Sequence, residues 1–207
     1  MTPSIQSTAH TTRRDQHPLI GREVGSFLVI SHLATGGMCE LYTAVHTALE
    51  RHAVLKIPRS DLPYRALVSE RLRSEARILA SVHHSNVVEV YDLGLLAGEP
   101  YLALELLAGR ALDEVLYEHG RLSVPKALRI ARETARGLLA FHRNEIVAVD
   151  VKPENIMVIN GPLVGRQRRG EVWVKLIDLG AGVHMRELRL ADEEPQYLGT
   201  PAYASPE

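Results

Sequence analysis

The stretch AVDVKPENIMV at residues 148–158 decides how this sequence is interpreted. Asp150 and Asn155 are five residues apart, with Lys152 between them, in a short polar turn beside apolar segments. A carboxylate in such a turn can take a proton from a hydroxyl group, a lysine can bind a phosphoryl group, and an amide oxygen can bind Mg²⁺. Each residue alone would more often be an ordinary loop residue, so the interpretation depends on the rest of the sequence.

A further acid follows the next apolar segment. Asp178 comes directly after the apolar run of residues 172–177 and is followed by Leu179 and Gly180. An acid at the end of a strand is typical of a metal ligand, although a loop acid is the simpler interpretation of this residue by itself. Together and in this order, the polar residues of the two segments favour a site for phosphoryl transfer.

Upstream, a lysine and a glutamate each occupy a position where a charge is costly. Lys56 is centred in the apolar run of residues 53–57. Glu75 lies three residues after Leu72 and four before Leu79, so the helical period places it on the apolar face of a helix expected over residues 66–82. Buried charges are expensive unless they are paired. We therefore predict that Lys56 and Glu75 pair, which would suit binding of phosphate oxygens.

A glycine turn precedes Lys56. Ala34, Gly36 and Gly37 lie between two predicted strands, and Leu41 begins the second of them. Glycines in such a turn let backbone N–H groups approach an anionic ligand. A purely structural hairpin is the alternative, and the turn alone does not distinguish the two.

The remaining pattern predicts a fold of the α+β class. Expected strands cover residues 27–30, 41–45, 53–57, 87–91, 101–107, 146–149, 156–159 and 172–177. Expected helices cover residues 66–82, 112–119 and 123–143, and the apolar period of the last runs through Leu128, Ala131, Ala135, Leu138 and Leu139. Residues 1–18 are interpreted as a flexible tail and residues 161–171 as a loop.

Composition narrows the classes of partner. The 207 residues carry 24 Lys and Arg against 25 Asp and Glu, so no net charge favours nucleic acid or a membrane surface as the main partner. The one cysteine, Cys39, excludes an internal disulfide and fits a reducing compartment. Because the chain has neither an apolar run of membrane-spanning length nor a signal-peptide pattern, we expect a cytoplasmic protein.

These motifs resemble those of the eukaryotic-like serine/threonine protein kinases of bacteria. The runs DVKPEN at residues 150–155 and GTPAYASPE at residues 199–207 carry the resemblance, which extends from about Gly21 to the last residue. It implies a two-lobed protein-kinase-like fold, with an N-lobe over about 19–104, a hinge over 105–108 and an incomplete helical C-lobe over 109–207. The implied activity is phosphoryl transfer from ATP, with Mg²⁺ or Mn²⁺, to Ser or Thr hydroxyls of protein substrates.

The resemblance also implies a role for each matching catalytic residue. Asp150 would accept or orient the proton of the substrate hydroxyl, and Lys152 would steady the phosphoryl group. Thr200 would contact Asp150 and the substrate residue. Asn155 and Asp178 would bind Mg²⁺.

Nucleotide binding is implied for a second set of residues. Lys56 would hold the α- and β-phosphates and pair with Glu75. The remaining nucleotide contacts would come from Ala34, Gly36, Gly37 and Leu41 in the phosphate loop and from Val54, Leu104, Glu105, Leu107 and Met157 around the adenine.

Several positions depart from the family pattern. Ala34 and Cys39 stand in place of two loop glycines, and Ala34 would be strained by about 1–3 kcal/mol if it needed a glycine-like backbone. Val54 replaces the usual alanine beside the adenine, and Ala148-Val149 replaces the usual His-Arg before the catalytic aspartate. These departures leave a second hypothesis open, a truncated or inactive nucleotide-binding module without catalysis.

Two segments of the C-terminal part complete the expectations. Residues 182–198 contain no Ser or Thr, so we expect activation that does not depend on a phosphoserine or phosphothreonine there. The basic run of residues 166–169 is interpreted as a solvated loop, with docking of an acidic partner as an alternative and nucleic-acid binding as a weaker one. The resemblance ends at Glu207, within the family's Ala-Pro-Glu motif.

Overall fold

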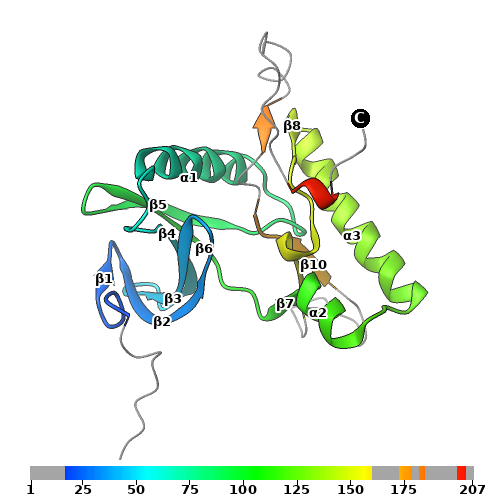
Figure 1. Ribbon diagram of the computed structural model, residues 1–207, viewed down its shortest axis with the longest axis horizontal. Coiled ribbons are helices and arrows are strands. Elements are labelled where there is room, and N and C mark those ends of the chain that lie inside the picture. Colours follow the sequence, from blue (N-terminus) through cyan, green and yellow to red (C-terminus); the bar gives the residue numbers. More distant parts are fainter. Residues whose placement is uncertain (1–16, 160–172, 179–181, 185–199, 204–207) are drawn as a thin grey trace, which may run out of the picture.

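The structure is a computed structural model that describes residues 17–159, 173–178, 182–184 and 200–203. Its larger sheet has six antiparallel strands in the order β1-β2-β3-β4-β6-β5, and Figure 1 shows this sheet on one side of the molecule with α2 and α3 on the other. The strands of this sheet are β1 Glu23–Val24, β2 Phe27–Thr35, β3 Cys39–His46, β4 His52–Pro58, β5 Val90–Leu96 and β6 Glu99–Glu105.

The two faces of this sheet have different surroundings. Because side chains alternate along β4, Leu55 points to one face while Val54 and Lys56 point to the other. The face of Leu55 is covered by its own apolar core, formed by Val24, Phe27, Val29, Tyr42, Ala44, Ala53, Leu55, Ile57, Tyr101 and Ala103. Lys56 therefore leaves β4 on the opposite side of the sheet from this core.

Helix α1 (Arg65–Ala80) packs on the face that carries Lys56. Its buried side chains include Val68, Leu72 and Leu79, whose spacing predicts the helix from the sequence. Glu75 lies among them and is 3% exposed, which confirms that the helical period turns this carboxylate toward the interior.

The second part of the molecule begins after residues 106–108, which have no regular structure. Its strands form a three-stranded sheet, β10-β9-β7, and a two-stranded sheet, β11-β8. Its elements are β7 Gly109–Ala111, α2 Leu112–His119, α3 Val124–His142, β8 Ile146–Val147, the 3₁₀ turn η2 Pro153–Asn155, β9 Ile156–Ile159, β10 Trp173–Leu176, β11 Val183–His184 and the 3₁₀ turn η3 Pro201–Tyr203. Asp150 and Lys152 lie in the irregular segment between β8 and η2, and Asp178 follows the end of β10.

The segment before β5 joins the two parts directly. The Val88 N–H donates to the Leu176 carbonyl at 2.9 Å, and the Leu176 N–H donates to the Asn86 carbonyl at 2.9 Å. The strand predicted over 87–91 is therefore wrong in position, because Val87 makes a single parallel bridge to Leu176 and the sheet strand begins only at Val90. Burial of Val87 and Val88 against β10 gives the same apolar pattern as a strand.

Helix α3 buries a different face from the one its apolar period indicates. Its buried residues are Ile130, Glu133, Thr134, Gly137 and Phe141, while Leu128 and Leu139 are exposed. Two of these buried residues are polar, and one of them, Glu133, is bound there by Arg132 and Arg136 and by the Asn86 side chain. Gly137 allows close approach, since a Cβ atom at this position would lie 3.0 Å from the Asn86 carbonyl oxygen.

The α+β class expected from the sequence is confirmed. The described part of the chain contains no helix with the length and apolar character that crossing a membrane requires. Strand β7 was not predicted, because its three residues begin at Gly109 and show no apolar period.

Candidate functional site

A buried ion pair links β4 to α1. The Lys56 ammonium lies 2.8 Å from both carboxylate oxygens of Glu75, and 3.4 Å from Oδ2 of Asp178. The Lys56 side chain is 15% exposed and that of Glu75 only 3%. We call these three residues the Lys56 cluster, and it confirms the pairing of Lys56 with Glu75 that the sequence predicts.

The charges of the Lys56 cluster perturb one another strongly. Burial of Lys56 disfavours its charge, but the carboxylates of Glu75 and Asp178 outweigh burial and hold the pKa of the ammonium above its usual range. Burial raises the pKa of the Glu75 carboxyl to about 7, and the neighbouring Asp178 adds to this while Lys56 opposes it. The cluster therefore holds a permanent cation whose position is fixed by a helix.

A second constellation lies in the segment before η2. Oδ1 of Asp150 accepts a hydrogen bond from the Thr200 hydroxyl at 2.7 Å, and Oδ2 lies 2.7 Å from the Lys152 ammonium. The Lys152 ammonium also donates to the Thr200 hydroxyl at 2.8 Å, which closes a triangle. We call Asp150, Lys152, Thr200 and Asn155 the Asp150 network. It brings together residues 50 positions apart in the sequence.

Hydrogen bonds set the charge state and orientation of the Asp150 network. Burial of Asp150 raises the pKa of its carboxyl, but hydrogen bonds from Lys152 and Thr200 outweigh burial and hold the pKa below its usual value. The Asn155 amide donates from Nδ2 to the Asp150 carbonyl at 2.9 Å, which turns its oxygen Oδ1 away from that carbonyl. Asp150 is therefore an ionised hydrogen-bond acceptor at neutral pH.

Backbone contacts place the metal-binding candidates next to each other. The Ile177 N–H donates to the Asn155 carbonyl at 3.1 Å, so the residue before Asp178 is hydrogen-bonded to η2. Asp178 in turn lies against Lys56. Asp178 thus belongs to the Lys56 cluster and directly follows a residue that is hydrogen-bonded to Asn155 of the Asp150 network.

The glycine turn connects β2 to β3. Ala34 lies in β2, pairs with Leu41 of β3 and does not have a positive φ, so the strain considered for a glycine-like backbone is absent. Gly36 lies close to the backbone of Cys39, since a Cβ atom at Gly36 would lie 3.2 Å from the Cys39 carbonyl oxygen. Gly37 has open space around it. Leu41 pairs with Lys56 across β3 and β4, which places the turn near the Lys56 cluster.

The residues expected around an adenine lie at the border of the two parts. Val54 of β4 pairs with Leu104 of β6, and both contribute to the core that α1 shares with the second part. Leu107, in the irregular segment after β6, packs against the same core. Met157 of β9 is half-buried and pairs with Lys175.

One contact at this border escaped the sequence analysis. Lys175 of β10 forms an ion pair and hydrogen bond with the carboxylate of Glu105, the last residue of β6. The sequence did contain an indication of this contact, because Lys175 is one of only four lysines and, like Lys56, occupies an apolar strand.

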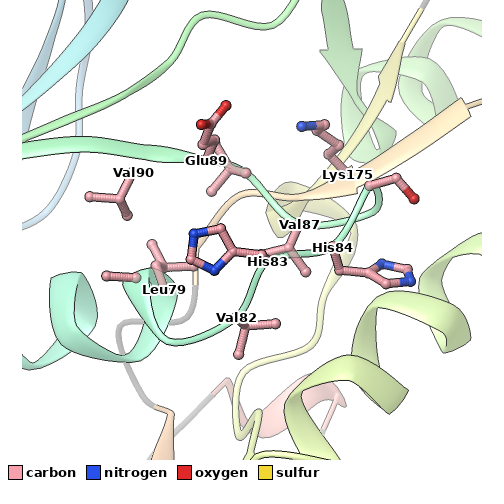
Figure 2. Close-up of a pocket in the computed structure, with 11 residues that line it drawn as sticks. Leu79, Val82, His83, His84, Val87, Glu89, Val90 and Lys175 are labelled. Carbon is pink, nitrogen blue, oxygen red and sulfur yellow. The ribbon is translucent and has the colours of Figure 1, made fainter.

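Lys175 also lines a cavity of about 310 Å³, which Figure 2 shows. Leu79 at the end of α1, His83 and Lys175 are among the residues that line it. None of the catalytic or nucleotide-binding candidates belongs to its lining, so it is separate from the site.

Some predictions concern residues outside the described ranges. These are the first 16 residues of the tail predicted over 1–18, the loop over 161–171, most of the segment without Ser or Thr, and the last four residues, 204–207. The prediction of a flexible tail is wrong at His17, whose ring stacks on His32 and lies 2.7 Å from the Tyr42 hydroxyl. Cys39 is described and buried, and burial raises the pKa of its thiol to about 11.

Comparison with known proteins places this arrangement in a family. The sequence matches the family described as "Protein kinase domain" over residues 27–207. It is 34% identical over 186 residues to serine/threonine-protein kinase pkn2 of Myxococcus xanthus, covering 88% of this chain and 21% of that protein. It is 30% identical over 190 residues to serine/threonine-protein kinase PrkC of Bacillus subtilis, covering 91% of this chain and 28% of that protein.

A third relative agrees with these two. The chain is 33% identical over 186 residues to the probable serine/threonine-protein kinase pknA2 of Bifidobacterium longum, covering 88% of this chain and 23% of that protein. The chain thus spans about a quarter of the length of the curated relatives that it matches. Because the family match covers most of the chain and the α+β architecture agrees with it, the chain belongs to the protein kinase family and has a partial form of that family's two-lobed fold.

Proposed function

We propose that this chain catalyses ATP-dependent phosphoryl transfer to Ser or Thr hydroxyls of protein substrates. The observation that carries the proposal is the Asp150 network. Its carboxylate is ionised and accepts a hydroxyl hydrogen bond at 2.7 Å, with a lysine ammonium 2.7 Å away on its other oxygen. A carboxylate that receives a hydroxyl beside a cation fits proton acceptance from an attacking alcohol.

Thr200 supports this role because its hydroxyl lies beside Asp150 at a position that the substrate hydroxyl could also reach. In the proposed reaction, the substrate hydroxyl would donate to Asp150, and Thr200 would hold the approaching residue in place. Lys152 would balance charge on the phosphoryl group as it moves. These roles require only side chains that the structure already brings together.

The Lys56 cluster would bind the phosphates of the nucleotide. Glu75 holds the Lys56 ammonium with both oxygens, so the cation does not have to be ordered when the nucleotide binds. Val54 and Leu41 lie on the same face of the sheet as Lys56 and present apolar surface there. A cation next to apolar side chains suits a ligand with a phosphate chain and a planar base.

The side-chain oxygen atoms of Asn155 and Asp178 suit a hard cation. Asn155 and Asp178 offer an amide oxygen and a carboxylate, which are ligand types that Mg²⁺ and Mn²⁺ accept. When bound, such an ion neutralises phosphate oxygens. The contribution of this chain is to hold Asn155 through the Asp150 carbonyl and Asp178 beside Lys56.

The test uses the 207-residue chain and its Asp150→Asn variant. We expect transfer of label from γ-labelled ATP to a generic basic protein by the unmodified chain and loss of transfer in the variant. A thermal-shift titration with ATP, with and without Mg²⁺, measures binding in both proteins. Binding by both proteins without transfer by either would overturn the proposal and support the nucleotide-binding module that Val54 and Ala148-Val149 favour.

A further inference from the structure

A group of polar contacts joins α1 to the start of β6, outside the Lys56 cluster. Glu99, the first residue of β6, accepts a hydrogen bond at Oε2 from the Ser69 hydroxyl of α1 at 2.6 Å. Its other oxygen, Oε1, lies 3.4 Å from the guanidinium of Arg65, one helical turn before Ser69. Ser69 is only 3% exposed, so its hydroxyl needs a protein partner. We call Glu99, Ser69 and Arg65 the Glu99 clamp.

A tight hairpin fixes the position of Glu99. Ala97 and Gly98 separate β5 from β6, and both have a positive φ, of 51° and 87°. Two consecutive residues with positive φ are typical of the type I′ turn, whose geometry matches the twist of the strands that it joins. Glu99 pairs with Leu96 directly across this turn. The carboxylate is therefore attached to a backbone position that has little freedom.

The clamp supplies what the beginning of α1 lacks. Among the residues that the structure describes, none caps this helix end through the side chain of the N-cap residue Tyr64, and the first helical turn contains no acid. A negative charge near a helix N-terminus is favourable because the helix dipole is positive there. Glu99 brings such a charge from a neighbouring strand, through Arg65 of the first turn and Ser69 of the second. The clamp thus attaches this end of α1 to the sheet.

The clamp and the Lys56 cluster hold the same buried face of α1. Ser69 and Glu75 are both buried and are six residues apart, which corresponds to about 9 Å along a helix axis. Ser69 is bound to the start of β6, and Glu75 is bound to Lys56 of β4. Lys56 in turn pairs with Leu102 of β6, so the two attachment points lie on neighbouring strands.

The two kinds of contact on this face differ in how precisely they fix the helix. Apolar packing has no preferred direction, so it tolerates small rotations and shifts of α1. A hydrogen bond is lost when its two atoms move apart by about 1 Å. The hydrogen bond from Ser69 to Glu99 therefore restricts the rotation and the axial position of α1, and with them the position of Glu75.

We propose that Glu99 is a positioning residue, which fixes α1 through Ser69 and so holds the Glu75 carboxylate against the Lys56 ammonium. Arg65 contributes less, because its ion pair with Glu99 is partly exposed. The inference rests on the proposed function in one respect, namely that the Lys56 ammonium binds the nucleotide. Without the clamp, Glu75 would move away and burial would disfavour the charge of Lys56.

The first measurement needs no nucleotide, because it follows the reactivity of the Lys56 amine. The folded 207-residue chain is treated with an amine-acylating reagent, and modification of Lys56 is measured by mass spectrometry with Lys126 of α3 as the internal reference. An amine that is unpaired and less protected reacts faster, so Glu99→Ala and Ser69→Ala should each raise the relative rate at Lys56 several-fold. An unchanged rate in both variants would overturn the inference.

Two further variants serve as controls for this measurement. Glu99→Gln keeps an oxygen that can accept the Ser69 hydrogen bond, so it should restore most of the protection of Lys56. Glu70→Ala removes a glutamate of the same helix that is 69% exposed and pairs with Arg73. It should react like the unmodified chain. Equal acceleration in Glu70→Ala and Glu99→Ala would overturn the inference, because the effect would then follow from any loss of charge on α1.

The second measurement is the affinity for ATP. Loss of a hydrogen bond to a charged group should raise the Kd for ATP by about tenfold in Ser69→Ala and in Glu99→Ala. In a Glu75→Gln background the same substitutions should have no further effect, because the charge through which the clamp acts is already absent. An undiminished effect in that background would show a general effect on the fold and would overturn the inference. If the unmodified chain did not bind ATP while acylation of Lys56 was accelerated in the alanine variants, the proposed function would fail and the positioning role would be supported.

Discussion

The Lys56 cluster and the Asp150 network hold their charges in opposite ways. Lys56 and Glu75 project from a strand and a helix, and the Glu75 side chain is 3% exposed. Asp150 and Lys152 lie in an irregular segment, with side chains 19% and 23% exposed, and are held by a threonine 50 residues away. The Lys56 cluster is held by the packing of a strand and a helix, whereas the Asp150 network is held by hydrogen bonds among its own side chains. Stability and chemistry should therefore respond differently to substitutions in the two places.

The largest expected effect concerns the chemistry of the Asp150 network. Asp150→Asn keeps the shape of the side chain but removes the acceptor charge, so the rate of phosphoryl transfer should fall by about 10³-fold. Label transfer at saturating ATP measures the rate. Because Asp150 is not packed in the core, the unfolding temperature and ATP affinity should stay close to those of the unmodified chain. A large loss of stability would contradict the contrast between the two sites.

The next effect concerns stability at the Lys56 cluster. Lys56→Met leaves the buried Glu75 without its cation, and the free energy of unfolding should fall by about 3 kcal/mol. The double variant Lys56→Met/Glu75→Leu removes both charges and should recover most of that loss, while nucleotide binding stays impaired. Urea unfolding measures the first quantity and ATP thermal shifts the second. If the free energy of unfolding did not recover in the double variant, the ion pair would contribute more to stability than the cost of burying its two charges.

A smaller effect is expected at Thr200. Thr200→Ala removes the hydroxyl from Asp150, and loss of one hydrogen bond to a charged group corresponds to a roughly tenfold lower transfer rate. The free energy of unfolding should change by less than about 1 kcal/mol, because the network is partly exposed. Thr200→Ser restores the hydroxyl and serves as the control. A serine variant as slow as the alanine variant would assign the effect to the methyl group.

The smallest effect compares the two carboxylates by pH in the nucleotide-free chain. The pKa of Glu75 is raised to about 7, so the folded state binds more protons than the unfolded state and the Glu75 contribution to stability falls as the pH rises from about 4.5 to 7. The pKa of Asp150 is lowered, so its contribution is complete above its ordinary pKa and is lost as the pH falls. Unfolding of the unmodified chain against Glu75→Gln and Asp150→Asn over pH 2–8 measures both slopes, and slopes of the same sign would refute the contrast.

The difference between regular elements at the Lys56 cluster and an irregular segment at the Asp150 network also explains which contacts could be predicted from the sequence. The Lys56–Glu75 pair followed from local periods alone, because a strand and a helix each place side chains on known faces. The Asp150 network needed a motif, since no period describes an irregular segment. The contact between Asp150 and Thr200 was expected only from the family resemblance, because their separation in sequence carries no geometric information.

Other features were beyond the sequence for physical reasons. The buried face of α3 was predicted wrongly because Glu133 and Thr134 are polar. Glu133 is paired there with its helix neighbours Arg132 and Arg136 and with Asn86, which comes from a distant part of the chain. The contacts of His32 with His17 and Tyr42 depend on the register of β2 and β3, which contains two irregularities, one of them directly after His32. Register of this kind is set by the whole hairpin and cannot be counted from residue spacing.

The attachment of β10 to the lobe that contains the six-stranded sheet affects how the two lobes can move relative to each other. The lobes are joined covalently through residues 106–108, and β10 adds two further connections. Leu176 donates a backbone hydrogen bond to the Asn86 carbonyl and accepts one from the Val88 N–H, and Lys175 forms an ion pair with Glu105. Lys175 and Leu176 are consecutive residues of β10, and Glu105 directly precedes residues 106–108, so all of these connections lie close together. Opening and closing of the lobes should therefore be a rocking motion with its pivot along β10, so that displacement is smallest at the hinge and greatest at the tip of the glycine turn.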